Sequence, residues 1–198
     1  MNGTRENLDV WRHYEAAAEA AASLLALSRC RTTDREPAHA LHLRQRLQLI
    51  DLLHTFAYNA RRAIELAEQL ETGTISHAQS ISVRPYGRVD IELEIMEDAR
   101  PLADQSVWWI LGRIIHAREL NIHYLEDAEV GTEWAPKPHI TVYSMPVAFS
   151  VRSDHDGPEE RHFVLIAELL AAYLALRGRF VKAMHAAGYP LEEHSLFY

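Results

Sequence analysis

The sequence predicts a mainly α-helical fold: a four-helix up-and-down bundle with a small antiparallel β-sheet inserted in the connections. Three observations predict it. Four long segments repeat apolar residues every three to four positions, several of them carry capping or stop signals, and two shorter segments alternate apolar with polar residues. At 198 residues the chain is expected to form a single helical domain, residues 1–198, with β-hairpin embellishments at 81–95 and 139–152.

The first two helices are expected at residues 8–29 and from about residue 33 to residue 71. Alanine richness raises the helix propensity of the first, whose apolar stripe is formed by Val10, Tyr14, Ala17, Ala21, Leu24 and Leu25. In the second, Thr33 and Glu36 have the spacing of a capping box, and Gly73 follows as a stop signal. A helix of this length would span about 50 Å.

Two segments then change to the period of a half-buried strand. In the first, Val89, Ile91, Leu93 and Ile95 alternate with acidic residues, and a turn is predicted at Pro85-Tyr86-Gly87. In the second, residues 140–143 and 147–151 are predicted as two strands around Met145-Pro146. We expect these strands to join in one small sheet.

The third and fourth helices complete the predicted bundle. The third is expected from about Asp98 to Asp127, and its predicted core face consists of Trp108, Leu111, Ile115, Ile122 and Leu125. Trp108 and Trp109 are assigned to the core or to an interface. The fourth helix is expected from about residue 156 to Gly188; a start near Ile166 follows if residues 163–166 extend the strands.

Composition and charge narrow the classes of function. The formal net charge of −8 disfavours broad duplex binding, although a local basic groove remains compatible with it. A single cysteine, Cys30, indicates a reducing compartment, and the polar N-terminus lacks a signal-peptide pattern, so we expect a cytoplasmic protein. Glu168 interrupts the longest apolar stretch, so no membrane span is expected.

The polar positions of the predicted third helix are the first candidates for chemistry. On a helical wheel Arg113, His116, Glu119 and His123 fall within an arc of about 120° and could line one groove. The alternative is an ordinary polar face that meets solvent or forms salt bridges with a neighbouring helix.

The Arg118-x4-His123 motif, together with the long predicted helices and residues 56–65 (FAYNARRAIE), resembles the HEPN domain family. The resemblance implies metal-independent RNA cleavage in a homodimer, without a cofactor, often within toxin–antitoxin or phage-defence systems. Arg118 would then bind the scissile phosphate, and His123 would transfer protons because its pKa would lie near the working pH. The substrate-binding candidates are Arg113, His116 and Tyr124. Glu119 departs from the family pattern, in which an amide more usually follows the arginine.

Two other classes of function stay open. One is a non-enzymatic regulatory or structural subunit that binds a protein partner through its helices and strand edges. The other is a metal-binding bundle, because histidines on neighbouring helices can bind a metal ion. The residues considered for it are His54, His116 and His123, with the pairs Glu36/His39 and Glu159/His162.

Overall fold

The computed structural model describes residues 3–33, 38–70, 75–86, 103–130, 140–158, 160–186 and 188. Within these ranges the helices α1–α5 hold more residues than the strands β1–β6, and every strand pairing is antiparallel. The prediction of a mainly helical chain with an antiparallel sheet is therefore confirmed. None of the described helices combines the length and the apolar character needed to cross a bilayer.

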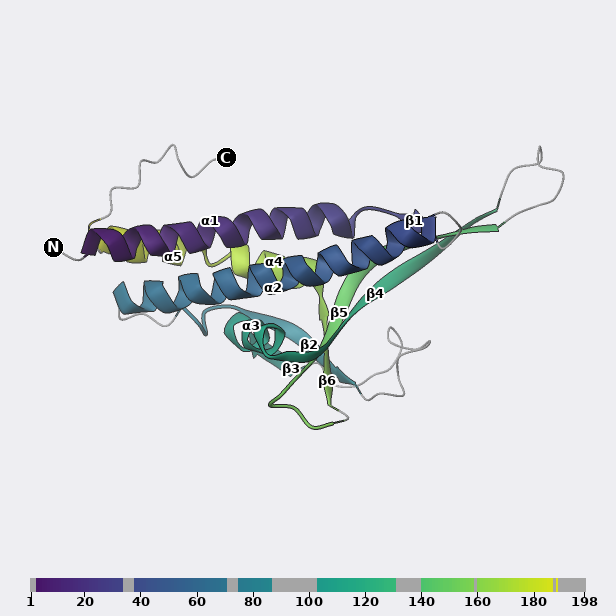
Figure 1. Cartoon of the computed structure of the whole chain (residues 1–198). Helices are drawn as coiled ribbons and strands as arrows, with labels where there is room; N and C mark the ends of the chain where they lie inside the picture. Colours follow the sequence, from purple (N-terminus) through teal and green to yellow (C-terminus); the bar gives the residue numbers. More distant parts are fainter. Residues whose placement is uncertain are drawn as a thin grey trace.

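The two longest helices, α1 (Gly3–Ser28) and α2 (Ala38–Leu70), run antiparallel side by side along one side of the molecule (Figure 1). Both were predicted within a few residues. Small alanines on the facing stripes let the two backbones approach closely. The buried stripe of α2 consists of Leu49, Leu53, Phe56, Ala57, Ala60, Ala63, Ile64 and Ala67.

The predicted third helix is wrong over most of its length. Among the described residues of this stretch, from 103 onwards, only α3 (Val107–Ile115) is helical; residues 103–106 form strand β3 (Ala103–Ser106), and the long strand β4 (Ala117–Val130) follows. The Ser106 hydroxyl accepts a hydrogen bond from the Trp109 N–H and caps the helix start. His116 leaves the helical conformation, with φ −98° and ψ 23°. This stretch therefore does not supply the third long helix of an up-and-down bundle.

Strand β4 pairs along its length with β5 (Ile140–Ser153), from Ala117 opposite Ser153 to Val130 opposite Ile140. Residues 140–153 are thus one continuous strand, and the predicted hairpin around Met145-Pro146 is wrong. A bulge marks that position instead: His123 pairs with Ala148, and Tyr124 pairs with Pro146. Proline lacks an N–H donor, so it is tolerated in a strand where the ladder is already interrupted.

The remaining strands extend the sheet from β5. Strand β6 (Arg161–Leu165) pairs with both β5 and β2 (Ser80–Tyr86), and β2 pairs with β3. The short β1 (Thr32–Thr33) pairs with residues 143–144 of β5.

Pro85 and Tyr86 continue β2 instead of turning, which corrects the predicted turn. The predicted strand at 89–95 lies outside the described residues.

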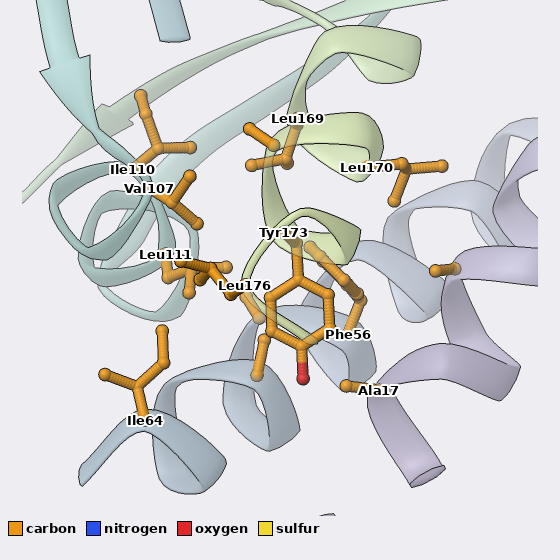
Figure 2. Close-up of a cluster of buried hydrophobic side chains, with 14 of the residues drawn as sticks. Ala17, Phe56, Ile64, Val107, Ile110, Leu111, Leu169, Leu170, Tyr173 and Leu176 are labelled. Atoms are coloured by element: carbon orange, nitrogen blue, oxygen red, sulfur yellow. The ribbon is translucent and has the colours of Figure 1, made fainter. Parts of the chain in front are cut away.

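The later of the two predicted starts for the last helix is correct, because β6 leads directly into α4 (Ile166–Leu174). A break at residues 175–176 separates α4 from α5 (Arg177–Ala186), and Gly188 follows with a positive φ of 77°. Figure 2 shows the resulting core: Tyr173 of α4 lies among side chains of α1, α2 and α3, including Ala17, Phe56 and Leu111.

Candidate functional site

A pocket of about 270 Å³ lies on the outer face of α3. The helix buries Val107, Ile110, Leu111 and Ile114 against the core. The residues between them, which span about 140° of the helical wheel, face the pocket: Trp108, Trp109, Gly112, Arg113 and His116. Arg61 from α2 and His155 from the β5–β6 turn complete the lining. The short helix therefore forms the floor, and two other elements form the sides.

Each tryptophan of the pocket is paired with an arginine. The Arg61 guanidinium lies 4.4 Å from the ring centroid of Trp108, and the Arg113 guanidinium lies 4.5 Å from that of Trp109. Such cation–π contacts hold both planar groups in fixed orientations. Gly112 leaves room for Arg61, because a Cβ at this position would lie 2.9 Å from the Arg61 Nη1. The pocket thus combines flat apolar surfaces with N–H donors.

Arg113 also ties α3 to the β5–β6 turn. Its Nη1 donates to the Ser153 hydroxyl at 2.7 Å and lies 3.2 Å from the Asp156 Oδ1. The Ser153 hydroxyl and backbone N–H both donate to the other Asp156 oxygen, at 2.8 and 2.7 Å. Burial alone would raise the pKa of Asp156, but the hydrogen bonds from Ser153 and His162 outweigh it and hold the pKa below its usual value. The turn is therefore anchored to α3 by an ionised carboxylate.

Two histidines stand at the exposed rim of the pocket. The rings of His116 and His155 are 5.6 Å apart at a steep angle, and Asp154 lies beside His155. The Asp154 N–H donates to the His116 carbonyl at 3.2 Å, which joins the end of α3 to the turn through the backbone. Imidazoles in this position can donate or accept hydrogen bonds and can bind a metal ion.

The structure brings together only part of the predicted site. Arg113 and His116 line the pocket, as the shared helical face predicted. Arg118 and His123 lie on β4, not on a helix, and the five residue steps between them along the strand separate their backbones by roughly 16 Å. Arg118 is exposed at an irregularity of the β4–β5 pairing, whereas the half-buried His123 ring lies 5.3 Å from that of Phe163.

The expectation that His123 has a pKa near the working pH is wrong. Burial, with a smaller contribution from the nearby positive charge of Arg46, lowers the pKa of His123 to about 4. Its imidazole is therefore neutral near pH 7. A proton-donating role at that pH has no support from this environment.

Two more residues of the predicted site have other partners. The Tyr124 ring lies 4.5 Å from that of His42, and burial raises the pKa of Tyr124 despite the opposing charge of Arg46. Glu119, which departed from the family pattern, forms ion pairs with Arg152 and with the buried Arg161. Hydrogen bonds from Arg152 and then from Arg161 lower the pKa of Glu119. Glu119 therefore joins three strands of the sheet.

Several pocket residues were not predicted as functional. Trp108 and Trp109 do pack against the core, as expected, but their exposed parts line the pocket. The signal available in the sequence was the run of Trp, Gly, Arg and His at helical spacing between residues 108 and 116. Nothing in the local sequence links Arg61 or His155 to that run, because tertiary packing alone brings them together.

Chemically, the pocket can hold a planar group beside an anion. Each guanidinium uses only part of its N–H donors on the partners described, Glu65 for Arg61 and Ser153 with Asp156 for Arg113. Indole and guanidinium planes stack on aromatic ligands, and guanidinium N–H groups bind phosphate or carboxylate.

Comparisons of the chain with protein-family models, with curated proteins and with solved structures find no match, so the HEPN resemblance stays an expectation.

Proposed function

We propose that this protein binds single-stranded RNA, one nucleotide of which occupies the pocket on α3. The observation that carries the proposal is the pairing of two tryptophans with two arginines around one small pocket. Aromatic and guanidinium planes stack on unpaired bases, and arginines bind the adjacent phosphates. A volume of about 270 Å³ suits one unit of a chain better than a whole drug-sized ligand.

The net charge of −8 is consistent with local recognition. A protein that binds duplexes through many phosphates needs an extended basic surface, whereas a pocket needs only a few cations. Arg61 of α2 and Arg113 of α3 supply such cations to a single pocket. We therefore expect single-stranded RNA to bind more tightly than a duplex of the same length.

The test uses adjacent arginines of α2. Arg61 lines the pocket, whereas its neighbour Arg62 pairs with the same Glu65 but does not line it. We expect Arg61→Gln to weaken binding of a labelled single-stranded oligoribonucleotide by about tenfold, since one charge-assisted contact is lost, while Arg62→Gln has little effect. Fluorescence anisotropy at several salt concentrations measures both the affinity and the number of phosphate contacts.

The same samples test the cleavage that the HEPN resemblance implies. Labelled RNA is incubated in chelator with wild type, Arg118→Ala and His123→Ala, and its length is followed by gel electrophoresis. Cleavage that is lost in both variants would restore the Arg118/His123 hypothesis. Equal weakening of RNA binding by Arg61→Gln and Arg62→Gln, or no binding by wild type, would contradict the pocket proposal.

A further inference from the structure

We infer that the rim of the α3 pocket is a binding site for a divalent transition-metal ion such as Zn²⁺, with His116, Asp154 and His155 as protein ligands. One ligand atom from each of the three residues lies within 4.8 Å of the others. Two imidazoles and a carboxylate form a donor set that Zn²⁺ accepts in three-ligand sites, with water or a ligand in the fourth position.

The backbone around these residues is held in place before any ion binds. The Asp154 N–H donates to the His116 carbonyl, and the His155 N–H donates to the Ser153 hydroxyl. Arg113 and Asp156 both bind that same hydroxyl, so the turn and the end of α3 are one hydrogen-bonded unit. Ligands that start from a fixed backbone lose little conformational freedom when they bind a metal ion.

The three side chains need only a small movement. Ligand atoms around one tetrahedral Zn²⁺ lie about 3.3 Å apart, given metal–ligand distances of about 2 Å. The side chains of His155 and Asp154 are 66% and 41% exposed, so they can change rotamer without disturbing the core. The distance between the His155 Nε2 and the Asp154 Oδ1 is already 3.4 Å.

A second group of ligand-type residues, Asp156, Glu160 and His162, lies nearby. It is a poorer candidate, because the Asp156 Oδ1 already lies 3.2 Å from both the Arg113 Nη1 and the His162 Nε2. A metal ion there would displace a cation that anchors the turn. By contrast, the Asp156 carboxylate, 3.2 Å from the Arg113 Nη1, offsets part of the positive charge that would oppose an ion at the rim.

The proposal is tested with ZnCl₂ alone, by isothermal titration calorimetry on full-length protein without a polyhistidine tag. We expect one ion to bind per chain, and His116→Ala and His155→Ala each to weaken binding by at least about tenfold. The matched controls, which should leave the affinity unchanged, are His185→Ala, an exposed histidine on α5, and Glu160→Gln, from the second group. The intensity of the visible absorption of Co²⁺ reports independently whether the ion leaves its six-coordinate hydrated state for a four-coordinate site on the protein.

Two results would overturn the inference. One is the absence of wild-type binding at about 1 mM zinc. The other is a loss of affinity in Glu160→Gln that His116→Ala and His155→Ala do not reproduce. Because all these variants alter exposed side chains, their folding can be verified by circular dichroism. RNA plays no part in the titration, so its outcome is separate from that of the RNA-binding proposal.

Discussion

His123 shows how strongly position in the sheet changes the chemistry of a single side chain. Its ring is half-buried beside Phe163, and burial followed by the charge of Arg46 lowers its pKa to about 4 from an ordinary 6.5. The unfolded chain therefore binds a proton more readily than the folded chain between these two values. The stability contributed by neutral His123 is present above about pH 6.5 and is lost as the pH falls towards 4.

We predict that protonation of His123 lowers the unfolding free energy of the wild-type protein by about 1–2 kcal/mol between pH 7 and pH 5. This value allows for the partial exposure of the ring. Urea denaturation of wild type at pH 7 and at pH 5 measures it, and His123→Gln should show a smaller change between the two conditions. His185→Gln, at an exposed histidine, is the control. An NMR titration of the His123 ring with a midpoint between 6 and 7 would contradict the prediction.

At the scale of one element, α3 combines a structural inner face with a pocket-lining outer face. Gly112 lies in the middle of the helix, where helix stability and the space needed by the pocket favour different residues. Alanine is favoured over glycine in a helix interior by about 1 kcal/mol. At this position, however, a Cβ would lie 2.9 Å from the Arg61 Nη1, which is the end of a flexible side chain and can move. The glycine therefore leaves space for Arg61 in the pocket, although alanine would stabilise the helix more.

We predict that Gly112→Ala leaves the unfolding free energy unchanged or raises it by up to about 1 kcal/mol, while RNA binding weakens several-fold. The loss of affinity follows from displacement of Arg61 away from Trp108. Gly178→Ala on α5 is the matched control, because no heavy atom outside its local backbone lies within 4 Å of the added Cβ. It should change stability in the same direction and leave RNA affinity as it is in wild type. Unaltered RNA affinity in Gly112→Ala would refute this role of the glycine.

For the whole molecule, one aromatic cluster joins four of the helices. Tyr173 of α4 lies 5.1 Å from Phe56 of α2, 6.1 Å from Tyr14 of α1 and 6.0 Å from Phe180 of α5, measured between ring centroids (Figure 2 shows the Tyr173 and Phe56 part). The Tyr173 hydroxyl is buried, and no hydrogen-bond partner for it is found among the described residues. Burial also raises the pKa of Tyr173 well above its ordinary value.

We predict opposite outcomes for two substitutions of Tyr173. Tyr173→Ala removes the ring and should lower the unfolding free energy by about 3–5 kcal/mol through loss of packing and creation of a cavity. Tyr173→Phe keeps the ring and removes only the unpaired hydroxyl, so it should be neutral or stabilising by up to about 1 kcal/mol. Chemical denaturation followed by circular dichroism measures both. A large loss in Tyr173→Phe would show that the hydroxyl has a partner.

The local sequence determined the elements whose formation depends on local pattern alone. Helices α1 and α2 have one long apolar stripe each and were predicted almost in full, and Gly188 marked the end of the last helix. The helical wheel also placed Arg113 and His116 on a face that could line a groove, and both residues line the α3 pocket. For the helices and for the Arg113/His116 face, residues three or four positions apart lie on one side of a helix, so the local sequence is enough to predict them.

The tertiary structure decided the conformation of residues 103–130 and the composition of the pocket. Ile115, Ile122 and Leu125 fit a helical stripe, but Leu120 and Ile122 also alternate with Glu119, Asn121 and His123, as in a strand. Two periodicities compete there, and pairing with the next strand, β5, at separations of 10 to 36 residues, favours the strand. Arg61 and His155 reach α3 for the same reason: their partners are distant in sequence, and only the packing of the complete core brings them together.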